Sequence, residues 1–323
     1  MERMERAELL QCIRDTLMYA GFYVSELYIM RLMGFDLVAR KDNALLIVKV
    51  LTNIDSLSED VANELKTLSF LLHGSPMLIG ERDGSGPLED NVVYYRFGIQ
   101  AITFNTLKNH LLDGMSIKAY AAPGGTYVNL DEKKLRRLRQ EQNISLGEFA
   151  RFVRVSRRTA RLYEEGMNAR FEIALRIEKL LGSTITIPID ILGTKSTDRK
   201  DVVLPGREIN SLKTFQREIF SLLEKVGYKI IPMERCPFEA LSKDRDQILL
   251  TCAHRYSRKL FRKAQIVSSI SRITEKHAVL FIDREIGKTN IEGTPIIMKS
   301  ELKKIRDPEE VIDLIIERKI KRT

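Results

Sequence analysis

Three arginines fall within five residues of one another near the middle of the chain, at Arg157, Arg158 and Arg161. A guanidinium group donates two parallel hydrogen bonds from a planar fork, which matches O6 and N7 of guanine. Ser156 precedes the arginines and is a favourable helix N-cap, so backbone N–H groups at that helix start could also meet a phosphate. These residue types at this spacing predict a helix that reads the major groove of double-stranded DNA.

The surrounding segment, residues 131–181, has the pattern of four short helices. Asp131 is predicted to cap the first helix, and Ser145, with Glu148 three residues later, has the spacing of a capping box at the second. The third helix is predicted over 156–164, and a fourth carries an inward stripe of Phe171, Ala174, Ile177, Leu180 and Leu181. Thirteen basic and eight acidic residues give this segment a net charge of +5, against +9 for the whole chain.

Within it, LRRLRQEQNISLGEFARFVRVSRRTARLYEEG resembles the Cro/cI-type (XRE-like) helix-turn-helix family. The resemblance implies a structural ion pair between Arg139 and Glu164, and base reading by Arg157, Arg158 and Leu162. The complete set of DNA-binding positions that it implies is Ser145, Leu146, Ser156, Arg157, Arg158, Thr159, Arg161 and Leu162. Arg154 stands where the family usually has glycine, which predicts either a strained or an altered turn.

Two α/β blocks are predicted to flank this segment. The fold class is therefore multidomain, with an all-α helix-turn-helix of four to five short helices at 128–190 between α/β domains at 1–120 and 207–323. The breaker cluster at 121–125 and the polar stretch at 194–206 are interpreted as linkers. Strands are expected at 77–80 and 101–104 with a glycine-rich loop between them, and an exit strand at 185–191.

The two flanking blocks align with each other without a gap at one point. DLVARKDNALLIVKV, which starts at Asp36, matches EALSKDRDQILLTCA, which starts at Glu239. A helix, a glycine and an aromatic residue precede each hairpin, at Gly21-Phe22 and at Gly227-Tyr228. The pattern favours an internal duplication, although any two units of helix, hairpin and helix resemble each other at this level.

The order of elements in each block resembles the PD-(D/E)-x-K fold of restriction endonucleases. That chemistry uses two carboxylates to hold Mg²⁺ and a lysine to orient the attacking water. Asp36 and Lys49 match the first acid and the lysine, but Ile47 stands at the second acid. In the second block Glu239 matches the first acid, while Leu250 and Cys252 occupy the other two positions. We therefore expect degenerate nuclease-like sites, no enzymatic activity, and no metal or cofactor; an unrelated α/β fold remains the alternative.

Composition is consistent with an intracellular protein that meets a polyanion. The pI is about 9.3, and the three cysteines, Cys12, Cys236 and Cys252, lack the spacing of a zinc site or a disulfide framework. No apolar run is long enough to span a membrane and no secretory signal is recognisable, so a cytoplasmic location is expected.

The sequence predicts a DNA-binding transcriptional regulator, and the whole chain resembles a group of archaeal HTH-type regulators. A homodimer is expected because one such recognition helix reads only a half-site. Two alternatives remain open: a metal-dependent nuclease targeted by the helix-turn-helix, and an adaptor that bridges activators and the basal transcription machinery. A small-molecule effector is not identified by the sequence.

Overall fold

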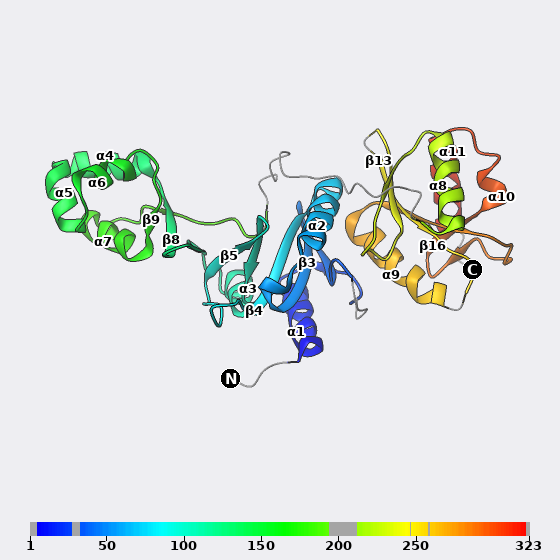
Figure 1. Cartoon of the computed structure of the whole chain (residues 1–323), viewed down its shortest axis with the longest axis horizontal. Coiled ribbons are helices and arrows are strands. Elements are labelled where there is room, and N and C mark those ends of the chain that lie inside the picture. Colours follow the sequence, from blue (N-terminus) through cyan, green and yellow to red (C-terminus); the bar gives the residue numbers. More distant parts are fainter. Residues whose placement is uncertain (1–4, 28–32, 194–211, 246, 258, 321–323) are drawn as a thin grey trace. The chain divides into compact units, whose positions relative to one another are not determined.

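The computed structural model describes residues 5–27, 33–193, 212–245, 247–257 and 259–320 (Figure 1). The chain divides into two compact units. The first comprises 1–50, 57–77 and 192–323, and the second comprises 51–56 and 78–191. Within the described ranges, no helix has both the length and the apolar character that crossing a membrane requires. The polar stretch at 194–206, which was interpreted as a linker, lies outside the described residues.

The N-terminal part of the first unit is built around a β-hairpin. Its elements are α1 (Arg6–Tyr19), β1 (Tyr23–Val24), β2 (Leu37–Lys41), β3 (Ala44–Asn53) and α2 (Glu59–Leu72). The strands pair antiparallel in the order β1-β2-β3, with Leu37 opposite Val48. Asp42 turns the hairpin at a positive φ of 49°. The predicted hairpin at 35–51 is therefore present.

The C-terminal part of the first unit contains a six-stranded mixed sheet in the order β11-β12-β13-β14-β16-β15. The strands are β11 (Lys229–Pro232), β12 (Ala240–Asp244), β13 (Gln247–Ala253), β14 (His277–Ile282), β15 (Asn290–Ile291) and β16 (Thr294–Met298). The helices are α8 (Thr214–Val226), α9 (Lys259–Thr274), α10 (Lys299–Leu302) and α11 (Pro308–Ile320). Residues of α8, α10 and α11 share one hydrophobic core with the sheet, and α9 packs against β14 and β16 without joining that core.

The two hairpins of the first unit share one register. Leu37 pairs with Val48, and Ala240 pairs with Thr251, which are the positions that the sequence alignment equates. The turn residues also correspond, because Asp42 and Arg245 have φ angles of 49° and 48°. The gapless alignment thus extends to strand pairing and turn geometry.

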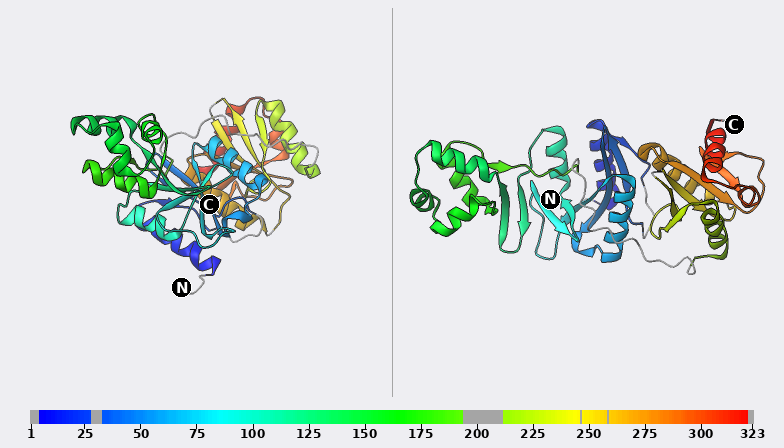
Figure 2. Two further views of the ribbon diagram at one scale, coloured as in Figure 1. Left: turned by 60° about the vertical axis from the view of Figure 1, so that its left-hand side comes forward. Right: turned by 90° about the horizontal axis from the view of Figure 1, so that it is seen from above.

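The second unit joins a sheet to a helical bundle. Its strands are β4 (Ser75–Arg82), of which residues 75–77 belong to the first unit, β5 (Val92–Arg96), β6 (Ile99–Ile102), β7 (Ala119–Ala122), β8 (Gly125–Leu130), β9 (Ala169–Arg170) and β10 (Thr186–Ile187). The sheet order is β4-β6-β5-β7-β8-β10, with β9 beside β8. The helices are α3 (Phe104–Leu112), α4 (Glu132–Glu141), α5 (Leu146–Val153), α6 (Arg157–Tyr163) and α7 (Phe171–Leu181), and Figure 2 shows α4 to α7 gathered into one bundle.

Several predictions for this unit were wrong. The breaker cluster at 121–125 is not a linker but the turn of the β7–β8 hairpin, in which Gly124 and Gly125 have φ angles of 93° and 135°. A strand, β5, replaces part of the predicted loop between 80 and 101. The exit strand is only Thr186–Ile187, and Phe171 is 42% exposed because it is the first residue of α7 rather than part of the inward stripe.

One hydrophobic core connects the helices of the bundle to the sheet. Val92, Ala119, Val128 and Leu130 of β5, β7 and β8 pack with inward residues of the helices, including Phe149. The bundle therefore rests on a sheet, and β8 continues at Asp131 directly into α4.

Candidate nucleic-acid interface

Serine caps fix the starts of the two helices that form the helix-turn-helix. Ser145 Oγ accepts a hydrogen bond from the N–H of Glu148 at 3.2 Å, and the Glu148 carboxylate accepts one from the N–H of Ser145 at 2.9 Å. The hydrogen bonds that the Glu148 carboxylate receives from the side chain and backbone of Ser145 lower the pKa of Glu148. At α6, Ser156 Oγ accepts a bond from the N–H of Thr159 at 3.0 Å. Both caps stabilise the helices that present the predicted contacts.

The turn between α5 and α6 passes through Arg154 in the left-handed region, at φ 63° and ψ 51°. The N–H of Val155 donates to the carbonyl oxygen of Ala150 at 2.9 Å, which closes the end of α5. A residue with a side chain pays about 1–2 kcal/mol for this conformation. The sequence left open whether the turn at Arg154 is strained or altered. The structure has the strained turn, in which Arg154 adopts the left-handed conformation that favours glycine.

Arg157 and Arg158 are exposed at the start of α6, and the described residues provide no ion-pair partner for either. The Arg157 guanidinium lies against the backbone of Gly147, because a Cβ added there would come within 2.5 Å of Arg157 Nη2. Gly147 is therefore a residue that the sequence analysis missed. The signal was a glycine in the first turn of a helix, where its low helix propensity needs a reason.

The side chains of the other predicted contact residues differ in exposure and in the bonds that they already form within the bundle. Arg161 pairs with Glu165, with 2.8 Å between Nε and Oε1, and Leu162 is 36% exposed. Leu146 is partly buried against the core of the bundle. Thr159 Oγ1 lies 2.8 Å from Ser156 Oγ within the cap.

Arg139 and Glu164 lie together across α4 and the end of α6. Arg139 Nε and Nη2 donate to the two Glu164 carboxylate oxygens at 2.5 and 3.1 Å, and Nη1 donates to the carbonyl oxygen of Ile144 at 2.7 Å. Glu164 is 7% exposed. The Arg139 guanidinium is therefore engaged inside the bundle and holds α6 against α4.

A polar and aromatic cluster beside the bundle was also missed. The rings of Tyr120 and Tyr127, on β7 and β8, stack with centroids 6.1 Å apart, and the Asn168 amide donates to the Tyr120 hydroxyl at 2.7 Å. Tyr127 pairs with Arg170 of β9 across the ladder. The signal was KAYAAPGGTYVNL, in which Pro-Gly-Gly separates two strand-like runs.

The nuclease-like position of the first block is a closed charge cluster. Asp36 is fully buried, and its carboxylate accepts hydrogen bonds from Arg6 Nη2 at 2.5 Å and from the N–H of Val50 at 2.7 Å. Lys49 Nζ lies 3.6 Å from the same carboxylate, and burial lowers the pKa of Lys49. Ile47 is fully buried. Both cations therefore compensate the single acid.

The second block repeats the acid but takes its cation from elsewhere. The Glu239 carboxylate accepts from the N–H of Ala253 at 3.0 Å and forms an ion pair with Lys263 of α9. Leu250 is buried, and burial raises the pKa of the Cys252 thiol to about 12. In the part of the chain that the structure describes, no group of three His, Cys, Asp or Glu residues is arranged to hold a metal ion.

A tight turn followed by a capped helix with exposed arginines defines a helix-turn-helix protein. The comparisons agree, because residues 135–187 match the helix-turn-helix family model. Residues 6–117 match the model of the PD-(D/E)XK superfamily domain. The chain thus combines an XRE-like helix-turn-helix with a PD-(D/E)XK superfamily domain and further mixed α/β structure.

Relatives of this chain carry the name "Putative HTH-type transcriptional regulatory protein". One from Methanocella arvoryzae is 35% identical over 320 residues, which cover 99% of this chain and 98% of the relative. Others from Methanosarcina mazei and Halobacterium salinarum are 37% and 33% identical, and each alignment covers 98% of both chains. The chain belongs to this family of archaeal HTH-type transcriptional regulatory proteins. No solved structure matches it.

Proposed function

We propose that this protein is a sequence-specific transcriptional regulator that places the helix between Ser156 and Glu164 in the major groove of double-stranded DNA. The observation that carries the proposal is the exposure of Arg157 and Arg158 at the capped start of α6, where no described residue forms an ion pair with either. A free guanidinium at this point can donate to the edge of a guanine. The proposed contact surface also includes Ser145, Leu146, Ser156, Thr159, Arg161 and Leu162.

The test begins with genomic fragments that the full-length protein selects, followed by binding measurements on the best fragment. Arg157→Ala and Arg158→Ala should each cost about 1–3 kcal/mol of binding free energy and relax the preference at one base position. Arg137→Ala is the matched control, because Arg137 is an exposed arginine that pairs with Glu141 on α4. Affinity and base preference that stay unchanged in both α6 variants would refute the proposal.

We further infer a homodimer on DNA and three domains, at 1–120, 128–190 and 207–323. The bounds of the two family models, 6–117 and 135–187, support the first two domains. The flanking domains are proposed to be duplicated copies of one PD-(D/E)XK-like fold. The shared hairpin register and the shared acid at Asp36 and Glu239, each bound by a backbone N–H of the second strand, support this duplication.

We propose that neither flanking domain cleaves DNA. Asp36 is enclosed by Arg6, Lys49 and a backbone N–H, and Ile47 supplies no ligand for a metal ion. The superfamily match at 6–117 nevertheless makes nuclease activity the second candidate. A plasmid-nicking assay with Mg²⁺ or Mn²⁺ should give no cleavage, and cleavage that Asp36→Asn abolishes would establish the nuclease instead.

An adaptor role makes a different prediction from a regulator that reads sequence. An adaptor to the basal transcription machinery would bind DNA weakly and without base preference. The same fragment selection separates the two, because only the sequence-reading regulator enriches a common motif.

A further inference from the structure

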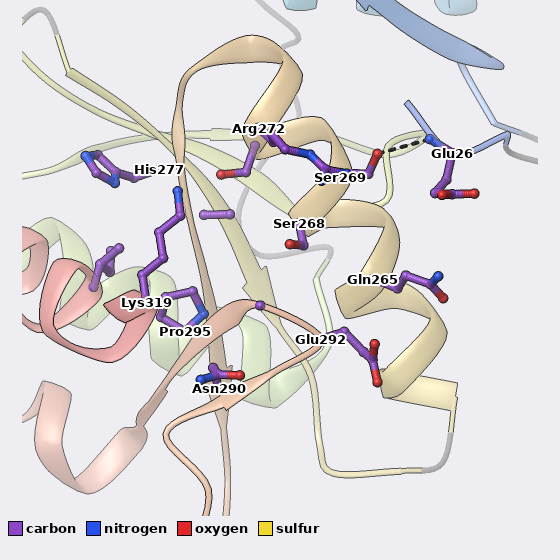
Figure 3. A pocket seen from close by; sticks show the side chains of 14 residues that line it. Glu26, Gln265, Ser268, Ser269, Arg272, His277, Asn290, Glu292, Pro295 and Lys319 are labelled. Carbon is purple, nitrogen blue, oxygen red and sulfur yellow. Dashed lines mark hydrogen bonds between the residues drawn. The ribbon is translucent and has the colours of Figure 1, made fainter. Parts of the chain in front are cut away.

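A pocket of about 530 Å³ opens in the first unit, and neither Glu239 nor Lys263 lines it (Figure 3). Its walls come from the second half of α9, the start of β14, the β15–β16 turn, the end of α11, and Glu26 of the segment that follows β1. Ala278, Pro295 and Ile315 provide the apolar surface. This volume is in the range of pockets that bind small molecules.

The charged side chains are distributed unevenly around the pocket. Figure 3 shows His277 and Lys319 on one side, Arg272 along one edge, and Glu26 and Glu292 on the other side. The described residues provide no ion-pair partner for the two cations, Lys319 and Arg272, or for the two carboxylates, Glu26 and Glu292. Two cations and two carboxylates thus line one hollow without neutralising each other.

His277 adds an unsatisfied polar atom to the cationic side. Its Nδ1 is buried and has no hydrogen-bond partner. Burial, and then the charge of Lys319, lower the pKa of His277, so the ring is neutral at pH 7. A buried ring nitrogen without a partner costs free energy at this edge of the pocket.

We propose that this pocket binds a small zwitterion such as a free α-amino acid, with its carboxylate toward Lys319 and Arg272 and its ammonium toward Glu292 and Glu26. Gln265, Ser268 and Asn290 supply further hydrogen-bonding groups along the wall. A ligand with only one charge would leave one pair of like charges unneutralised. The separation of the two signs therefore favours a ligand that carries both.

Calorimetry on the full chain tests this proposal, with each of the common α-amino acids, acetate and methylamine as separate probes. At least one amino acid should bind ten times more tightly than acetate and methylamine. Lys319→Gln should weaken amino acid and acetate binding at least fivefold and leave methylamine binding unchanged. Glu292→Gln should weaken methylamine binding at least fivefold and leave acetate binding unchanged. Lys319 and Glu292 are exposed, so both variants should fold.

Lys303→Gln, at the residue that follows α10, is the matched control, because Lys303 is an exposed lysine outside the pocket. NMR titration of His277 provides a second measurement. A bound carboxylate should raise the pKa of His277, because an opposite charge favours the protonated ring and offsets the repulsion from Lys319. Absence of amino acid binding, acetate or methylamine binding as tight as that of the amino acids, or equal effects of Lys303→Gln and Lys319→Gln would overturn the proposal.

Discussion

Arginine serves two purposes in the helix-turn-helix, and burial separates them. Arg158 is exposed on α6 and has no ion-pair partner in the part of the chain that the structure describes. The Arg139 side chain, by contrast, is 13% exposed and bound to both carboxylate oxygens of Glu164. The two residues have the same type and lie in similarly basic stretches. The charge pattern alone could not have distinguished them, and only the resemblance to a known family did.

Glu164→Gln should therefore destabilise the protein without removing any proposed DNA contact. The variant leaves the Arg139 guanidinium largely buried and opposite a neutral amide, which costs about 3 kcal/mol. Urea unfolding measures the loss, and Glu165→Gln is the control, because the pair that Glu165 forms with Arg161 is exposed. Equal losses in the two variants would show that burial does not set the strength of the Arg139–Glu164 pair.

Lys49 predicts a dependence of stability on pH. Burial lowers the pKa of Lys49 below 10.5 in the folded protein, so the unfolded chain holds this proton more strongly. Between the lowered pKa and 10.5 the unfolded state binds more protons, and the contribution of Lys49 to stability rises with pH. The free energy of unfolding of the wild type minus that of Lys49→Met should increase as the pH rises toward 10.5 and level off above it. A difference that is flat or falls with pH would contradict this assignment.

Elements with a local signal were predicted from the sequence, and elements that depend on distant pairing were not. The caps at Asp131, Ser145 and Ser156 lie where expected, because capping uses residues three positions apart. The β7–β8 hairpin was missed because Pro-Gly-Gly is equally typical of a linker and of a turn. Its strand character depends on pairing of β7 with β5 and of β8 with β10.

The turn before α6 carries a removable strain. Arg154→Gly should raise the free energy of unfolding by about 0.5–1 kcal/mol. Glycine adopts the left-handed conformation without the steric cost that a side chain brings, and the larger conformational entropy of glycine in the unfolded chain offsets part of this gain. Thermal and urea unfolding measure this gain. Arg151→Gly, within α5, is the opposite control and should destabilise by about 1 kcal/mol. A loss of stability in Arg154→Gly would mean that the Arg154 side chain makes compensating contacts.

At the scale of the whole molecule, the blocks that contain Asp36 and Glu239 share a hairpin register but not the partners of their acids. The acids Asp36 and Glu239 correspond, whereas their cations come from α1 and β3 in one block and from α9 in the other. The alignment of the two hairpins could not show this, because Arg6 and Lys263 both lie outside the aligned segments. The sequence was sufficient to predict that both sites lack a second acid, but not that each remaining acid is neutralised by a different partner.

The proposed homodimer makes a prediction about the DNA that it binds. Two copies of α6 related by a twofold axis would read two half-sites, whose centres are separated by one helical turn or a multiple of it. Inserting about 5 base pairs between the half-sites turns one of them to the opposite face of the duplex, and should lower the affinity at least tenfold. Scrambling one half-site should have a similar effect, because only one recognition helix would then read its bases. Affinity that is unchanged by the insertion, together with a footprint over a single half-site, would show that the protein binds as a monomer.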